Sequence, residues 1–215
     1  MVSTRKKMEY GLKWNPDPPV TVPQLVAYAL ATGVYTILAW LSILALPFIQ
    51  VPGVGGLFIA MGFGVPFAMW FGGWGLLMGF IGTSVGTGIL TGMPVPIAAA
   101  FGVGDIILFG SLVLIYRGLA PKFGVDPLGR DIYKSFKSFL FFFICGANIP
   151  HILGSAYGTW LLYATGLVPP NLLWVTFFGM WIGNVIVVTV IAPILLRFLG
   201  PVVERFGLTN HGWLT

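Results

Sequence analysis

The sequence predicts an all-α polytopic membrane protein with six transmembrane helices and with both termini in the cytoplasm. Of its 215 residues, 57% are hydrophobic and only 8% are charged, whereas an average soluble domain has about 25% charged residues. Its mean hydropathy is +0.94. The apolar runs are about 20 residues long and do not alternate with polar residues, which favours helices over the strands of a barrel. We therefore expect a multi-pass protein of the cell membrane.

The apolar segments divide the chain into a central domain and two tails. We expect residues 1–21 to form a cytoplasmic tail, residues 22–199 the six-helix transmembrane domain, and residues 200–215 a second cytoplasmic tail. One long basic loop, residues 117–137, interrupts the domain. The six expected helices cover residues 22–48, 54–70, 73–90, 96–116, 138–164 and 172–199.

The Lys and Arg residues predict the orientation of these helices. All eleven lie in the N-terminal tail, in the loop 117–137 or at the C-terminal end, and the turns after the first, third and fifth helices contain none. Positive charges gather on the cytoplasmic side of membrane proteins. Six helices with the N-terminus inside place every positive charge there, whereas five or seven helices would scatter the charges over both sides.

Several function classes are excluded or disfavoured by the residue inventory. The single cysteine, Cys145, permits neither an internal disulfide nor a cysteine metal cluster, and we expect no metal or cofactor. The formal charge of +5 comes from residues that flank apolar runs, so an anionic leaflet is a better partner than nucleic acid. The segment 82–86 is similar to a serine nucleophile turn, but no catalytic motif accompanies it. We expect no enzyme.

Glycine is abundant, with 30 residues, and much of it lies inside the expected helices. Small residues at a spacing of four let helix backbones approach closely. Such pairs occur in the third helix, at Gly75 and Gly79 and again at Gly82 and Gly86. Further pairs lie in the first helix, Ala27 with Ala31 and Ala29 with Gly33. These pairs predict either tight internal packing or a face on which another membrane subunit docks.

Polar residues recur at one depth in four helices. Asp105 is the only acidic residue inside an apolar run, twelve residues before Arg117, which is about 18 Å along a helix. A charge at that depth is costly, so Asp105 should face the interior and have a partner or be protonated. We expect a ligand-binding cavity lined by Asp105, Asn148, His151, Asn184, Thr83 and Thr87. A buried network that ties the helices together, or a proton relay of Asp105 and His151, would explain the same residues.

Two helices contain related motifs and indicate a resemblance. Gly104-Asp105-Ile106-Ile107 leads to Arg117, and Gly183-Asn184-Val185-Ile186 leads to Arg197, which suggests a weak repeat of helix pairs. With the glycine-rich segment 72–92 and the segments 116–119, 181–184 and 192–196, these motifs resemble the MASE1 family of membrane sensory domains. More distantly, the chain resembles the substrate-binding S components of energy-coupling factor (ECF) transporters. The resemblance covers about residues 50–200.

The two families imply different functions. S components bind a vitamin or a similar small molecule and dock on a membrane coupling protein with two ATPases, through an alanine-xxx-alanine face that Ala27 and Ala31 match. MASE1 domains are usually fused to kinase or cyclase modules, and this sequence contains none, so a sensor would act through a separate partner. We therefore expect a small-molecule-binding transport subunit, or alternatively a membrane sensor or anchor. A membrane enzyme is a third, less favoured hypothesis.

Overall fold

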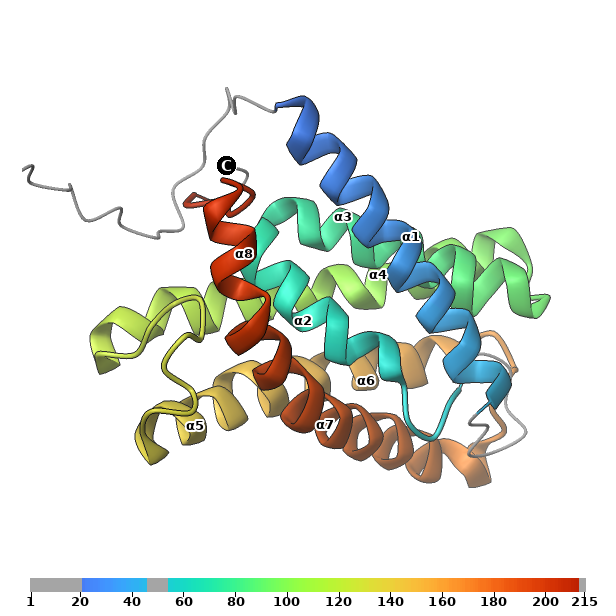
Figure 1. Ribbon diagram of the computed structural model, residues 1–215. Coiled ribbons are helices and arrows are strands. Elements are labelled where there is room, and N and C mark those ends of the chain that lie inside the picture. Colours follow the sequence, from blue (N-terminus) through green and yellow to red (C-terminus); the bar gives the residue numbers. More distant parts are fainter. Residues whose placement is uncertain (1–20, 46–53, 213–215) are drawn as a thin grey trace, which may run out of the picture.

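A computed structural model describes residues 21–45 and 54–212, which form helices and turns without a strand (Figure 1). The predicted all-α polytopic class is confirmed. The N-terminal tail up to residue 20, the end of the first predicted helix after residue 45 and the turn that follows it lie outside the described residues.

The helices follow the predicted segments closely, and several continue through π or 3-10 turns. The α-helices are α1 (Val22–Ala45), α2 (Ile59–Phe71), α3 (Gly73–Gly82), α4 (Val95–Leu112), α5 (Phe136–Phe141), α6 (Ile149–Ala164), α7 (Leu173–Phe198) and α8 (Gly200–Arg205). π-Helical turns extend α3 over Thr83–Gly88, extend α4 over Val113–Arg117, and join α5 to α6 over Phe142–Asn148.

Five of the helical segments are long and apolar enough to cross a membrane: Val22–Ala45, Gly73–Thr91, Val95–Phe123, Phe136–Ala164 and Pro170–Phe198. The predicted second helix is the exception. It forms α2, which has 13 residues and is about 20 Å long, whereas the hydrocarbon core is about 30 Å thick. It ends at Gly72, whose φ of 57° turns the chain directly into α3. Among the described residues, five segments are therefore long and apolar enough to span a membrane, and α2 is a shorter apolar helix.

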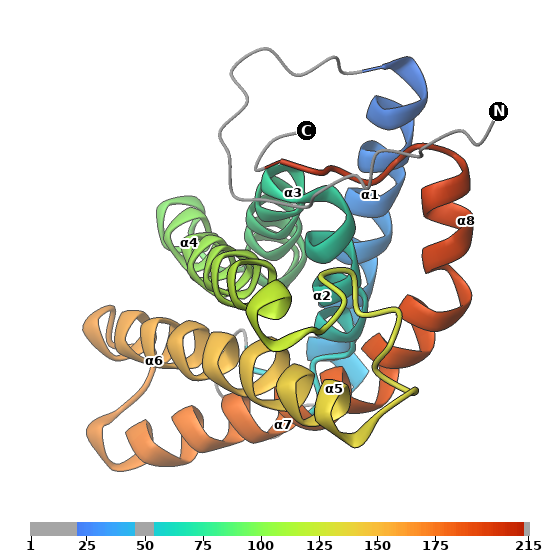
Figure 2. The ribbon, with the colours of Figure 1, turned by 90° about the vertical axis from the view of Figure 1, so that its left-hand side faces the viewer.

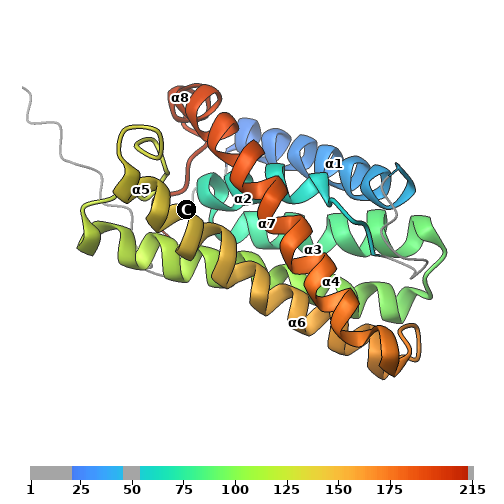
Figure 3. The same cartoon turned by 90° about the horizontal axis from the view of Figure 1, so that it is seen from below.

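The short helix α2 lies inside the bundle rather than at its edge. Ten of its 13 residues are buried, and it packs against α1, α3, α4 and α7. In the view of Figure 2, α2 lies near the middle of the other helices. Seen from below, α7 crosses the bundle beside it (Figure 3). A helix with an apolar surface on all sides is expected to be buried in this way.

The glycines of the third span serve internal packing. A Cβ on Gly75 would lie 2.5 Å from the Cα of Ala68 in α2, and one on Gly86 would overlap the backbone carbonyl of Thr36 in α1. Gly79 faces Phe109 of α4. Successive glycines thus let α2, α4 and α1 approach the same helix. At these positions the pairs pack helices within the chain instead of forming a docking face.

The C-terminal end of α2 is held by residues from distant parts of the sequence. The Arg117 guanidinium, which is 1% exposed, donates a hydrogen bond to the Met69 carbonyl. The backbone and side-chain amides of Asn210 donate to the carbonyls of Trp70 (2.7 Å) and Phe71 (2.6 Å). These bonds satisfy carbonyls that a helix end leaves without partners. We call this set of contacts the α2 cap.

The α2 cap adds detail to two segments expected from the sequence. Arg117 begins the expected basic loop 117–137, and its side chain is buried because it donates to an α2 carbonyl. Within the expected tail 200–215, Gly200–Arg205 form α8 and Asn210 packs into the bundle. The bundle end that carries Arg117 and Arg197 is called the basic end below.

Candidate functional site

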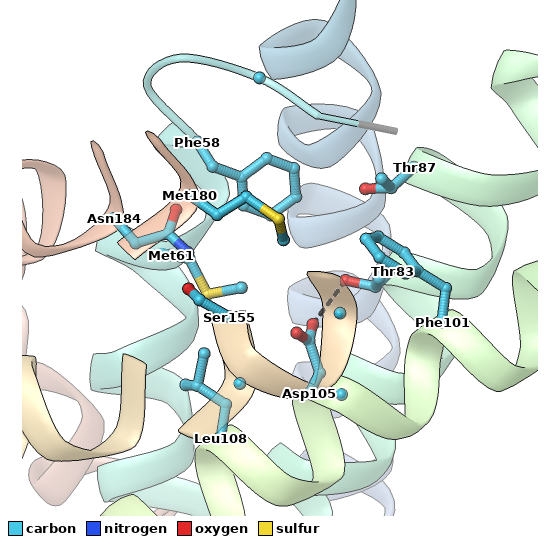
Figure 4. Close-up of a pocket in the computed structure, with 14 residues that line it drawn as sticks. Phe58, Met61, Thr83, Thr87, Phe101, Asp105, Leu108, Ser155, Met180 and Asn184 are labelled. Carbon is cyan, nitrogen blue, oxygen red and sulfur yellow. Dashed lines mark hydrogen bonds between the residues drawn. The ribbon is translucent and has the colours of Figure 1, made fainter. Parts of the chain in front are cut away.

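A cavity lies between α2, the end of α3, α4, α6 and α7 (Figure 4). Its polar side chains are Thr83, Thr87, Asp105, Ser155 and Asn184. Apolar side chains complete the wall, among them Phe58, Met61, Phe101, Leu108 and Met180. Polar groups from four segments therefore converge in a mostly apolar chamber, an arrangement typical of small-molecule sites.

Asp105 lies at the centre of the hydrogen bonding in this cavity. Its carboxylate oxygen Oδ2 accepts a hydrogen bond of 2.7 Å from the hydroxyl of Tyr35 and one of 2.5 Å from the hydroxyl of Thr83. The side chain is 5% exposed. As expected, Asp105 faces the bundle interior and has partners. Two donors partly replace the hydration that a carboxyl group loses at this depth.

Glycines of the third span allow this arrangement. A Cβ on Gly79 would lie 3.1 Å from the Cβ of Asp105, and one on Gly82 would overlap the ring of Tyr35. Larger residues at either position would push α1 or α4 away from the third span. The close approach brings Tyr35, Thr83 and Asp105 within hydrogen-bond distance, although they belong to three segments.

Three further polar side chains face the cavity without a hydrogen-bond partner among the described residues. The hydroxyls of Thr87 and Ser155 are buried, each residue being 1% exposed, and neither has a partner in residues 21–45 or 54–212. Asn184 is 6% exposed and lines the same chamber from α7. Buried polar groups usually have a partner, from the protein, water or a ligand. These three groups are available to a bound molecule.

Two expected residues lie outside the cavity. The Asn148 side chain donates a hydrogen bond of 2.8 Å to the Phe143 carbonyl of its own segment. His151 is fully buried, and its Nδ1 lies 2.6 Å from the Ala147 carbonyl, to which Nδ1–H donates. Neither residue lines the chamber. The π-helical turn before α6 shifts their direction from that of a regular helix, and carbonyls of their own segments engage their side chains.

The cavity thus contains four of the six residues expected from the sequence, namely Asp105, Asn184, Thr83 and Thr87. Tyr35 and Ser155 are not among the residues that the sequence predicted. A signal for Tyr35 was present, because Tyr28, Ala31, Tyr35 and Ala39 recur at helical spacing and form the buried face of α1. Ser155 carried no comparable signal, since hydroxyl residues are common in apolar helices and often bond their own backbone.

The two residues predicted to dock a partner, Ala27 and Ala31, differ in their exposure at the surface of the bundle. Ala31 is 6% exposed and belongs to the core of the chain, so a partner cannot reach it. Ala27 is half-buried. The inward direction follows from the position of Ala31 between Tyr28 and Tyr35 on one helix face. The second small pair, Ala29 and Gly33, is exposed, and a Cβ on Gly33 would contact nothing within 4 Å.

Among the described residues, no group of three or more His, Cys, Asp or Glu side chains could hold a metal ion. No protein-family model matches the chain, and no curated protein or solved structure matches it significantly.

Proposed function

We propose that this protein binds a small cationic or hydrogen-bond-donating solute at Asp105, as the substrate-binding membrane subunit of a transport system. The observation that carries the proposal is the Asp105 carboxylate, which faces a chamber with partnerless hydroxyls at Thr87 and Ser155. A carboxylate in an apolar setting favours an opposite charge or a strong donor. Acidic groups at membrane depth commonly mark substrate or ion paths.

The hydrogen bonds of the carboxylate indicate how it would receive a solute. Tyr35 and Thr83 both donate to Oδ2, which leaves Oδ1 for a donor from the solute. The hydroxyl of Ser155 in α6 and the amide of Asn184 in α7 also line the chamber, and they would bind further polar atoms of the solute. A solute with one cationic or amine group and one or two further polar atoms fits this set. Phe58 and Met61 would enclose its apolar part.

The volume of the chamber favours a small solute. It is about 40 Å³, which is enough for a few water molecules, whereas sites for drug-sized ligands measure about 300–1,000 Å³. A vitamin-sized molecule would require the helices to separate. A monovalent cation or a short amine needs little or no such opening, so the proposal favours these over a vitamin.

The transport role requires a partner that supplies energy, because the sequence contains no nucleotide-binding motif. The outer face of α1 is a reasonable contact surface. This helix is the least buried of the five long apolar segments, because only 28% of its 18-residue apolar stretch is buried in the bundle. It exposes Ala29 and Gly33, which would let another helix approach closely. We therefore propose that the partner contacts α1 at Ala29 and Gly33, and not at Ala31.

Mass spectrometry of the molecules that copurify in mild detergent tests the proposal. Wild type should carry a small amine or cation that Asp105→Asn lacks, because the substitution keeps the shape of the side chain and removes its charge. Asp126→Asn is the matched control, since Asp126 pairs with Arg130 outside the chamber. Identical small molecules in wild type and Asp105→Asn would contradict the proposal.

A membrane sensor is the second candidate, and α2 favours it. One part of α2 lines the chamber through Met61, and its C-terminal end is held by Asn210 in the α2 cap. A solute that moves α2 would alter the contacts of residues 208–212. Hydrogen exchange of that segment should change on solute addition if the protein is a sensor. Copurification of an ATPase would favour the transport subunit.

A further inference from the structure

A second site lies at the basic end of the bundle, apart from the Asp105 chamber. A groove of about 400 Å³ is lined by Arg130, Tyr133 and Lys134 of the loop before α5 and by Leu196, Arg197 and Pro201 near the junction of α7 and α8. Three cations therefore surround one hollow. The proposed function uses none of these residues.

Two of the three cations have no acidic partner in the part of the chain that the structure describes. Arg130 pairs with Asp126 and with Glu204. Lys134 and Arg197 are exposed and form no ion pair with an acidic side chain among residues 21–45 and 54–212. The groove therefore keeps a net positive charge that an anion could neutralise.

The Arg197 guanidinium is held in place by aromatic rings. Its central carbon lies 5.3 Å from the centroid of the Tyr133 ring and 5.6 Å from that of the Phe198 ring. Cation–π contacts of this kind orient a guanidinium without using its N–H donors. The planar donors thus remain available to the paired oxygens of a phosphate group.

The surroundings of the groove are those of a lipid–water boundary. Arg197 is the basic residue of the last turn of α7, a span with hydropathy 2.1, and the polar helix end of such a span reaches the headgroup layer. Phe198, which follows Arg197 in the chain, is 67% exposed, and Phe136, two residues after Lys134, is 77% exposed. Large apolar side chains exposed on this scale indicate contact with apolar chains.

From these observations we propose that the groove binds the phosphate group of an anionic lipid. Arg197 and Lys134 donate to the phosphate oxygens, Arg130 adds positive charge at the rim, and Phe136 and Phe198 contact the acyl chains. Basic pockets at the ends of membrane helices suit such headgroups. Free phosphate has the same chemistry at its oxygens but lacks the acyl chains, so a direct comparison separates the two.

Native mass spectrometry of the delipidated full-length chain in detergent tests the site, with dioleoyl phosphatidylglycerol and dioleoyl phosphatidylcholine as probes. Phosphatidylglycerol should bind more tightly, and Arg197→Gln or Lys134→Gln should each weaken its binding about fivefold. Lys122→Gln is the matched control, because Lys122 is exposed in the same loop but does not line the groove. Arg197→Lys retains the charge but lacks the planar paired donors, so its affinity should lie between those of wild type and Arg197→Gln.

Three outcomes would overturn the proposal. One is equal binding of the two lipids, and another is a loss in Lys122→Gln as large as in Arg197→Gln. The third is displacement of phosphatidylglycerol by inorganic phosphate at equal concentration, which would make the free anion the ligand. Failure of inorganic phosphate to compete supports a lipid. The variants should unfold at the same temperature as wild type, because all the substituted side chains are exposed.

Discussion

The hydroxyl of Tyr35 donates a hydrogen bond of 2.7 Å to Oδ2 of Asp105, which joins α1 to α4 inside the bundle. The same hydroxyl lies 3.6 Å from the sulfur of Met61 in α2. Tyr35 is therefore one contact between α1 and the chamber wall, and among the described residues it is the only one of α1 that hydrogen-bonds Asp105. A movement of α1, such as docking of a partner would cause, would reach Asp105 through this residue.

Tyr35→Phe removes this hydroxyl and retains the ring. We expect the free energy of unfolding to fall by about 0.5–1.5 kcal/mol, because a buried carboxylate loses one of two donors. Thermal unfolding in detergent measures the change. Tyr163→Phe is the matched control, since Tyr163 is 46% exposed. Equal unfolding temperatures for the two variants would show that the Tyr35 hydrogen bond contributes nothing to stability.

Gly75→Ala tests the close approach of α3 to α2. The added Cβ would lie 2.5 Å from the Cα of Ala68, so one helix must shift, which costs about 1–3 kcal/mol in a packed core. Gly33→Ala places a methyl group where nothing lies within 4 Å, and it should leave stability unchanged or raise it slightly. Both effects are measured as shifts in unfolding temperature. A destabilised Gly33→Ala or an unaffected Gly75→Ala would contradict the packing.

Arg117→Met should release the α2 cap. The Met69 carbonyl would lose the donor that the guanidinium supplies, at a cost of about 1–3 kcal/mol for a buried group without a partner. Hydrogen exchange should rise selectively at the C-terminal end of α2. A global loss of stability would instead raise exchange throughout the protein. Arg205→Met is the control, because Arg205 is exposed at the end of α8. Unchanged exchange at residues 68–72 would contradict the role of Arg117.

His211 makes the C-terminal segment sensitive to acid. Burial lowers the pKa of its imidazole, and nearby Arg117 lowers that pKa further, while Glu204 acts in the opposite direction. A released or unfolded segment restores the ordinary pKa of about 6.5 and therefore binds more protons than the folded state. Stability should fall as the pH drops below about 6.5. Unfolding temperatures at pH 7.5 and 5.5 should differ more for wild type than for His211→Gln, and an equal difference would contradict this.

The sequence predicted the long elements well because their signals are strong and local. Apolar runs and breaker residues predicted the start of α1, both bounds of α7, and both bounds of α3 and α4 with their π-helical extensions to within a few residues. The end of α2 agrees with the prediction, but its start does not: the apolar run predicted a helix from residue 54, and α2 begins at Ile59. The burial of Arg117 depended on carbonyls 48 residues earlier in the sequence, which no local pattern reveals.

The candidate site was predictable in part for the same reason. Asp105 is conspicuous in an apolar run, and its depth also indicated Asn184, which lies on the chamber. His151 was conspicuous as well, but the direction of its side chain depends on the π-helical turn that precedes α6. The helical spacing of Tyr28, Ala31 and Tyr35 placed Tyr35 on the buried face of α1. Its role in the site became visible only through the contact with Asp105.

The most direct test of the account is chemical labelling of the chamber. Ser155→Cys in a Cys145→Ala background places a single thiol on the chamber wall. The cationic reagent 2-aminoethyl methanethiosulfonate should modify this thiol about tenfold faster than the anionic 2-sulfonatoethyl reagent, because the Asp105 carboxylate attracts one and repels the other. Asp105→Asn should remove the difference. A thiol that both reagents modify equally with Asp105 intact would contradict a chamber selective for small cations.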